Sequence, residues 1–182
     1  MNKISLVILA LLLCFTLPLI AQEKEMDKKE MADMPAPPPP LDDDFMNWMI
    51  GEWKGFSESE MGKSDDWMKC EMGFGGQFLT IEYKSEGPMG AYTGGGALTL
   101  NQEGGIEAVW IDSFRDISNG KGKRDGDVMT MHWDGKKGKG TRITEKVSDD
   151  KLTVTSKWEM SNGMVMESKS EFTRVKAMTE KD

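Results

Sequence analysis

Hydrophobic and polar residues alternate with a period of two along most of the chain after residue 51. Such alternation is typical of β-strands that bury one face. Turn sequences interrupt it, and Asn162-Gly163 is the strongest of them because a two-residue type I′ turn needs positive φ at both positions. The pattern predicts ten strands, over residues 52–60, 65–74, 77–85, 92–101, 105–112, 117–123, 127–133, 141–147, 151–159 and 164–174.

The spacing of these strands predicts an all-β fold. The connections are too short to hold crossover helices, so successive strands pair as antiparallel hairpins. About ten strands protect their edges by closing, which predicts a closed antiparallel up-and-down β-barrel. Three aspartates at 42–44 precede an apolar stripe with Phe45 and Trp48, and this pattern predicts a short N-terminal helix. The glycines 94–96 predict a bend or bulge at a barrel corner.

The two ends of the chain differ in composition from the barrel region. Residues 1–21 carry Lys3, a long apolar run and a small-residue end, which predicts a secretory signal peptide; a retained membrane anchor is the alternative. Residues 22–41 are polar and then proline-rich, which predicts a disordered linker. We expect the barrel to span 42–176 and a flexible tail to follow over 177–182. The protein is thus expected to be exported, to the periplasm or the medium, with no stable membrane insertion after signal cleavage.

Charge and cysteine content narrow the possible partners. The formal net charge is −8, and it becomes −9 without residues 1–21, which contain one lysine and no acid. A surface this acidic repels phosphate backbones, so we expect no nucleic-acid partner. Cys70 is the one cysteine that remains, and it cannot form an intrachain disulfide. The sequence does not indicate an oligomeric state.

Alternate residues of a barrel strand face the lumen, so the charged positions of each strand identify its outer face. This argument places His132 outside and Asp112, Glu145, Ser156, Ser168, Ser170 and Arg174 inside an otherwise apolar wall. Buried polar groups need partners, so the lumen is either wet or internally paired. A pocket is one interpretation, and a barrel filled by its own side chains is the other. The residues predicted to line a ligand pocket are Met68, Cys70, Met72, Trp110, Asp112, Met129, Met131, Trp133, Trp158 and Ser170.

Three short motifs resemble a known superfamily. Gly51-Glu52-Trp53 after a short helix, with Arg174 on the last strand, is similar to the start and end of calycin barrels such as lipocalins. Together with Gly94-Gly95-Gly96 and Val109-Trp110-Ile111-Asp112-Ser113, it most resembles the bacterial family called domain of unknown function 1579. The resemblance spans residues 45–176. It implies that the helix and Trp53 close one end of the barrel, and that Arg174 covers the indole through a cation–π contact.

Other chemistry has less support in the sequence. Related barrels that hold haem use a histidine near the chain end, whereas the sole histidine here is His132, so no haem or other cofactor is expected. Catalysis would need a base beside Cys70, or a pairing of Asp112 with Glu145, and we expect no enzyme. Sixteen methionines leave copper handling through Met and Cys ligands as an alternative, although no defined metal site is predicted. The leading hypothesis is a binder of a small apolar or amphipathic molecule, and a packed structural or interaction module is a further alternative.

Overall fold

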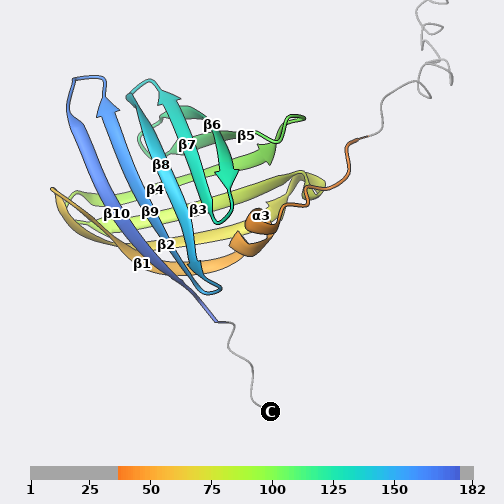
Figure 1. Ribbon diagram of the computed structural model, residues 1–182. Coiled ribbons are helices and arrows are strands. Elements are labelled where there is room, and N and C mark those ends of the chain that lie inside the picture. Colours follow the sequence, from red (N-terminus) through yellow and green to blue (C-terminus); the bar gives the residue numbers. More distant parts are fainter. Residues whose placement is uncertain (1–36, 177–182) are drawn as a thin grey trace, which may run out of the picture. The chain divides into compact units, whose positions relative to one another are not determined.

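The computed structural model describes residues 37–176, which form a ten-stranded barrel with a short helix beside it (Figure 1). The elements are α3 (Asp44–Met49), β1 (Gly51–Ser59), β2 (Gly62–Gly73), a 3-10 turn (Phe74–Gly76), β3 (Phe78–Gly87), β4 (Gly90–Leu100), β5 (Ile106–Asp112), β6 (Ile117–Asp125), β7 (Val128–Gly135), β8 (Gly138–Ser148), β9 (Lys151–Met160) and β10 (Val165–Arg174).

Every strand pairs antiparallel with its neighbours in sequence, and β10 returns to pair with β1. The predicted closed up-and-down barrel with a short N-terminal helix is thereby confirmed. Within the described strands, the register shifts only between β8 and β9, at Lys146 and Ser148. Of the bend or bulge expected at Gly94–Gly96, the bulge does not occur, because β4 keeps an unbroken register with β3 and with β5 through these glycines. Their role lies inside the barrel instead.

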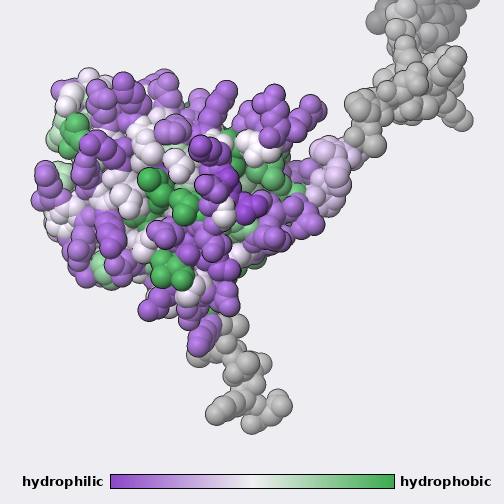
Figure 2. All heavy atoms as spheres, viewed as in Figure 1, coloured by the Kyte–Doolittle hydropathy of each residue, from purple (hydrophilic) through white to green (hydrophobic). Residues whose placement is uncertain are grey.

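Alternation along each strand divides the barrel into an apolar interior and a charged exterior. On β7, Met129, Met131 and Trp133 are buried while His132 is exposed. On the outside, lysines and glutamates form exposed pairs, such as Lys157 with Glu167 at 2.7 Å. Figure 2 shows this surface as mostly hydrophilic, with small separate apolar areas. Exposed pairs of this kind contribute about 0–1 kcal/mol each, so the stability of the fold comes mainly from the interior.

Helix α3 covers the closed end of the barrel. Its N-cap is Asp43, whose carboxylate accepts hydrogen bonds from the backbone N–H groups of Phe45 and Met46. The same carboxylate pairs with Arg124 at 2.9 Å, which ties the start of the helix to the end of β6. Phe45, Met46 and Met49 are buried against the barrel. Because these contacts fix both the start and the apolar face, six residues suffice for a stable helix here.

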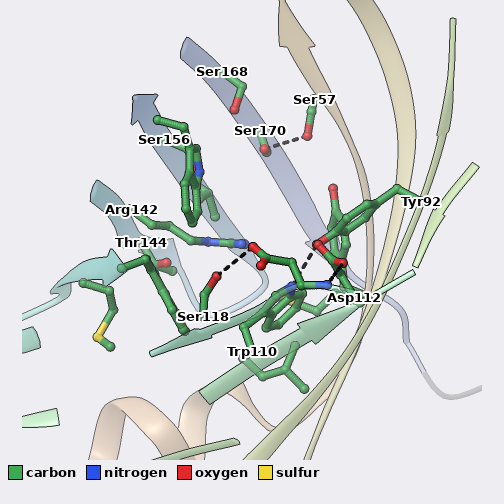
Figure 3. A pocket seen from close by; sticks show the side chains of 18 of the residues that line it. Ser57, Tyr92, Trp110, Asp112, Ser118, Arg142, Thr144, Ser156, Ser168 and Ser170 are labelled. Carbon is green, nitrogen blue, oxygen red and sulfur yellow. Dashed lines mark hydrogen bonds between the residues drawn. The ribbon is translucent and has the colours of Figure 1, made fainter. Parts of the chain in front are cut away.

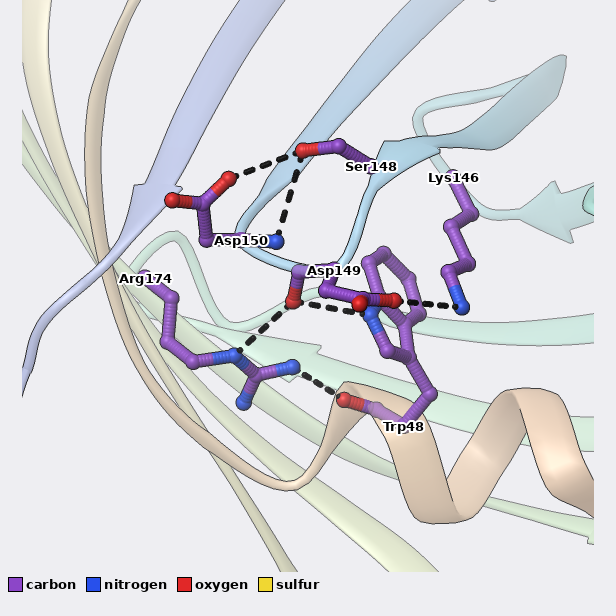
Figure 4. Close-up of polar contacts among 6 residues, drawn as sticks. All are labelled: Trp48, Lys146, Ser148, Asp149, Asp150 and Arg174. Atoms are coloured by element: carbon purple, nitrogen blue, oxygen red, sulfur yellow. Dashed lines mark hydrogen bonds and ion pairs between the residues drawn. The ribbon is translucent and has the colours of Figure 1, made fainter.

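The start of β1 and the end of β10 meet at the same closed end. Trp53 is fully buried, its Nε1 donates to the Met49 carbonyl at 2.9 Å, and its ring centroid lies 4.1 Å from the Arg174 guanidinium. Arg174 also donates to the backbone carbonyls of Trp48, Ile50 and Asp149. Figure 4 shows Arg174 between the helix and the β8–β9 turn, where Trp48 Nε1 donates to the same Asp149 carbonyl. The contact that the resemblance implied for Trp53 and Arg174 is therefore present.

Strand β8 has the opposite facing from the one predicted. Glu145 is exposed, and the buried side chain beside it is Thr144. The reason lies in Gly140, which is the register partner of both Trp133 and Trp158. Both indoles face inward, so Gly140 faces inward as well, and alternation then turns Arg142 and Thr144 toward the lumen. The predicted inward position of Glu145 is therefore wrong. Alternation along β2 also predicts that Phe74 faces inward, but Phe74 lies in the 3-10 turn and is 74% exposed.

The predicted signal peptide, most of the predicted linker and the predicted C-terminal tail lie outside the described residues. The last residues before the helix lie against the barrel: Gln77 Nε2 donates to the Pro38 carbonyl, and Leu41 N donates to the Gly76 carbonyl. Among residues 37–176, no helix combines the length and the apolar character that a membrane crossing requires.

Candidate functional site

The barrel encloses a cavity of about 330 Å³. Met49 of α3 lines it at the closed end, and Phe114 of the β5–β6 turn and Lys137 of the β7–β8 turn line it at the other end. These two turns are joined, because Lys137 Nζ donates to the Phe114 carbonyl at 2.9 Å. The volume lies at the low end of the range for small-molecule pockets. The barrel is therefore not filled by its own side chains.

The apolar wall of the cavity is built from tryptophans that lie over glycines. A methyl group added at Gly94 would lie 2.7 Å from the Trp110 ring, and one added at Gly140 would lie 2.6 Å from the Trp158 ring. Gly120 has the same relation to Trp133, at 2.8 Å. Since a strand residue without a side chain leaves space beside it, each indole can lie against the wall. The glycines therefore keep the lumen open while its wall stays aromatic.

A chain of hydrogen bonds runs along the aromatic side of the cavity toward the β5–β6 turn. Trp110 Nε1 donates to the Tyr92 hydroxyl at 2.8 Å, and that hydroxyl lies 3.5 Å from Asp112 Oδ2 (Figure 3). Asp112 Oδ1 also accepts from the backbone N–H groups of Phe114 and Asp116, at 2.8 and 3.1 Å. Asp112 thus holds the shape of the turn, and its contacts resemble those of a structural carboxylate more than those of a free acid or base.

The opposite side of the cavity carries hydroxyl groups. Ser57 and Ser170, register partners on β1 and β10, lie with their Oγ atoms 2.7 Å apart. Ser57 also donates to the buried carboxylate of Asp66, which accepts a second bond from Ser64 at 3.1 Å. Ser156 and Ser168 continue the hydroxyl side on β9 and β10 and line the cavity as well.

Arg142 brings a positive charge into this cavity from β8 (Figure 3). Within residues 37–176 its guanidinium forms no ion pair. Its positive charge partly offsets the rise in pKa that burial causes in the neighbouring phenols of Tyr83 and Tyr92. Burial raises the pKa of the Tyr83 phenol to about 12, assisted by the Asp66 carboxylate, while Arg142 acts to lower it. Burial also raises the pKa of Tyr92, so both phenols are neutral at physiological pH.

Two residues that line the cavity each carry a buried polar atom that has no hydrogen-bond partner among the described residues. These atoms are the indole Nε1 of Trp133 and Oδ1 of Asp116, in side chains that are 8% and 9% exposed. An unsatisfied buried group costs about 1–3 kcal/mol, so native proteins rarely leave one without a reason. A bound molecule that accepts from Trp133 and donates to Asp116 would remove both costs.

Eight of the ten residues predicted to line a pocket do line the cavity: Met68, Trp110, Asp112, Met129, Met131, Trp133, Trp158 and Ser170. Cys70 and Met72 do not. Cys70 is buried in the wall of the barrel, and Met72 is partly buried against the core near the end of β2. Both face inward as the alternation predicts, but at a level nearer the closed end. The binding role of the eight residues stays a prediction.

Sequence reasoning missed Arg142, Tyr92, Asp116 and Ser118. Arg142 was missed because a charged residue next to Ile143 was placed outside. Strand β6 carries no apolar residue on its inner face, where Ser118 alternates with Gly120, so its hydrophobic pattern contained no facing signal. The exposed residue Ile117, which is 59% exposed, even favoured the wrong face. The pairing of glycines with tryptophans across neighbouring strands was a usable signal.

The described residues offer little for catalysis or for hard-metal binding. Residues 37–176 contain no cluster of three or more His, Cys, Asp or Glu side chains able to hold a metal ion. His132 lies on the exterior, with its Nδ1 3.2 Å from the Thr141 hydroxyl. Burial raises the pKa of the Cys70 thiol to about 12, so this thiol is protonated at neutral pH and a poor nucleophile.

Comparison with known proteins supports the fold. No family model matches the chain, and no curated protein matches it either. Among solved structures, the chain is similar to the S-type phycobiliprotein lyase CPES from Guillardia theta, with 11% identity, a TM-score of 0.55, and coverage of 73% of this chain and 92% of that one. It is also similar to Rv2717c from M. tuberculosis, with 15% identity, a TM-score of 0.58, and coverage of 72% and 95%.

At these identities the similarity concerns architecture alone. The fold is a closed antiparallel β-barrel of ten strands, the architecture that the motif at Trp53 and Arg174 implied. The cavity inside it, with aromatic walls and a few convergent polar groups, has the features of a small-molecule binding site.

Proposed function

We propose that this protein binds a small amphipathic molecule in the lumen of its barrel. The observation that carries the proposal is the cavity of about 330 Å³, in which an aromatic wall surrounds buried polar atoms that have no partner among the described residues. A barrel whose role was purely structural would gain stability by filling this space, since an empty cavity costs free energy. Trp110, Trp133 and Trp158 would contact the apolar part of the ligand.

The proposal includes four further points that rest on the sequence or on single contacts. Residues 1–21 would direct export to the periplasm or the medium. The acidic charge disfavours a nucleic-acid partner.

No catalytic role is proposed, because the Cys70 thiol is protonated and the Asp112 carboxylate is engaged by backbone N–H groups. Finally, we propose a distant relation to the family called domain of unknown function 1579 on the short motifs alone, since no family model matches the chain.

A titration with the neutral fluorescent dye N-phenyl-1-naphthylamine tests the central point. The dye should quench the luminal tryptophans by energy transfer and gain fluorescence itself. Ser156→Phe places a ring inside the cavity, and Thr155→Phe places the same ring on the exposed outer face of β9 as a matched control. We expect Ser156→Phe to lower dye affinity at least about tenfold, with Thr155→Phe unchanged, provided that both variants unfold cooperatively. Dye binding that is absent, or equal in the two variants, would count against a luminal site.

Copper is the second candidate, because the thioethers of Met68, Met129 and Met131 line the same cavity and sulfur is a soft ligand. The protonated Cys70 thiol, outside the set of lining residues, weighs against it. Metal analysis of the protein purified from its own cells separates the two. Stoichiometric copper that is lost on replacing Met129 and Met131 with leucine would favour the copper hypothesis over the organic ligand.

A further inference from the structure

Three polar residues form a row across the inner wall of β8, β9 and β10. Arg142 is the register partner of Ser156, and Ser156 is the register partner of Ser168. Directly opposed residues of antiparallel strands lie on the same face with Cβ atoms about 4.5–5.5 Å apart. All three side chains line the cavity, so a guanidinium and two hydroxyls stand side by side on one part of its surface (Figure 3).

These groups differ from the polar groups that stabilise the fold. Arg124 pairs with Asp43, and Arg174 donates to backbone carbonyls, whereas Arg142 has no such partner within residues 37–176. Ser57 and Ser170 bond to each other, whereas the described residues offer the Ser156 hydroxyl no partner. A half-buried guanidinium beside free hydroxyls provides hydrogen-bond donors for an anionic oxygen group, which pairs strongly with arginine.

The aromatic residues lie one step nearer the open end. Trp133 and Trp158 are both register partners of Gly140, two residues before Arg142, so the two indoles flank the space next to the guanidinium. Each indole lies against a glycine on the neighbouring strand, at Gly120 and Gly140 respectively. Flat aromatic surfaces of this kind favour a planar guest, because stacked and edge-to-face contacts add to the area buried.

The unsatisfied atoms indicate what such a guest carries at its other positions. Trp133 Nε1 needs an acceptor, and Asp116 Oδ1, beside the open end at the start of β6, needs a donor. A planar acid that also bears an N–H or O–H group satisfies both while its acid group lies on Arg142. The charges of such a guest then match those of the cavity. Its acid group lies beside the cationic Arg142, and its hydrogen-bond donor lies at the end of the barrel that carries the carboxylates of Asp112 and Asp116.

We propose that the lumen is selective for planar aromatic or conjugated acids that carry a hydrogen-bond donor, with the acid group held by Arg142 and Ser156. This inference rests on the proposed function, since it names the class of molecule that enters the same cavity. Arg142 then determines specificity by its charge, and the tryptophans determine it by shape.

Two dyes with one skeleton test the inference separately from the proposed function. 1-Anilinonaphthalene-8-sulfonate carries a sulfonate and an N–H on its aromatic rings, and N-phenyl-1-naphthylamine lacks only the sulfonate. Both are titrated against the wild type, Arg142→Gln, Arg142→Lys and the control Lys157→Gln. Lys157 is an exposed cation next to Ser156 in sequence, so its replacement removes the same charge from outside the barrel. Thermal unfolding of each variant verifies that it is folded.

The wild type should bind the sulfonated dye more tightly than the neutral one. Arg142→Gln should weaken the sulfonated dye about 10- to 100-fold, as expected for loss of a charge-assisted hydrogen bond, and leave the neutral dye within about threefold. Arg142→Lys should retain part of the preference, and Lys157→Gln all of it. If both dyes bind but Arg142→Gln weakens them equally or not at all, the inference fails and the proposed function stands. If neither dye binds the folded wild type, both fail.

Discussion

The guanidinium of Arg174 lies 4.1 Å from the ring centroid of Trp53, and the two residues are register partners that join the last strand to the first. This contact closes the barrel at the end covered by α3. Arg174 also satisfies carbonyls of Trp48 and Ile50, in the last turn of the helix and just beyond it. One side chain therefore links barrel closure to helix docking.

Replacing Arg174 with methionine should destabilise the protein by about 2–4 kcal/mol. The cation–π contact contributes about 0.5–2 kcal/mol, and hydrogen bonds from a charged donor add about 1.5–3 kcal/mol before relaxation. Urea unfolding measures the loss. Lys169→Met, an exposed position on the same strand, should change the free energy of unfolding by less than about 1 kcal/mol. Equal effects of the two changes would show that Arg174 is only a surface residue.

At Gly94 and Gly120 the three nearest obstacles to an added methyl group all belong to an indole ring, so these two glycines should be intolerant of alanine because of the tryptophan alone. At Gly120, the three nearest atoms to an added methyl group all belong to the Trp133 ring, at 2.8–3.0 Å. We expect Gly120→Ala to cost about 1–3 kcal/mol, the usual penalty of overpacking. In a Trp133→Leu background the same change should cost much less. A double-mutant cycle measures this coupling, and additive effects would contradict the role assigned to the pair.

Asp43 has two roles that substitutions can separate. It caps α3 and it pairs with Arg124 at 2.9 Å. Asp43→Asn keeps a good cap but removes the charge, and should cost about 1 kcal/mol; Asp43→Ala removes both and should cost about 2–3 kcal/mol. Chemical denaturation of both variants, with Arg124→Gln for comparison, checks the order. If the asparagine variant were as unstable as the alanine variant, the cap would contribute nothing.

The buried thiol of Cys70 should make the stability of the protein fall at alkaline pH. Burial raises the pKa of its thiol to about 12 from 9.0. Above about pH 9 the unfolded chain loses a proton that the folded protein retains, so the stability from this group is complete below pH 9 and is lost as pH rises toward 12. The expected slope is about 1.4 kcal/mol per pH unit.

Urea unfolding of wild type and Cys70→Ala between pH 8 and pH 10.5 measures that slope. The variant has lost the packing of the sulfur atom, so its stability at pH 8 is lower and only the pH dependence is compared. The wild type should lose stability more steeply than the variant above pH 9. Parallel curves would mean that the thiol ionises equally in both states.

The sequence predicted those parts of the fold that depend on local pattern. Turn pairs such as Asn162-Gly163 located the hairpins, and strong alternation at Met129, Met131 and Trp133 oriented β7 correctly. The predicted type I′ turn at Asn162-Gly163 is wrong, however, because only Gly163 has a positive φ and four residues separate β9 from β10. The parts that failed depend on neighbouring strands. β8 is oriented by Gly140, which lies between two indoles, and this overrides the preference of Ile143 and Val147 for the interior; they are 38% and 56% exposed.

The residues of the cavity were likewise predictable only where the local pattern of their own strand gives the facing. Tryptophans and methionines of the cavity were predictable because large apolar residues mark inner faces. Arg142 was not, because a charged residue is assigned outward unless its strand is oriented by something else, here by Gly140. Asp116 lies in a turn, where alternation gives no facing at all. The polar residues that give a cavity its specificity are thus the ones that hydrophobic pattern finds least well.

The most direct test of the central claim is native mass spectrometry of the protein purified from its own cells. Wild type and the luminally blocked variant Ser156→Phe are compared with Thr155→Phe, which carries the added ring outside the barrel. The account predicts a copurified organic molecule in the wild type and in Thr155→Phe that is missing from Ser156→Phe. An unliganded wild type with an intact barrel, or a ligand that persists in Ser156→Phe, would contradict a binding site in the lumen.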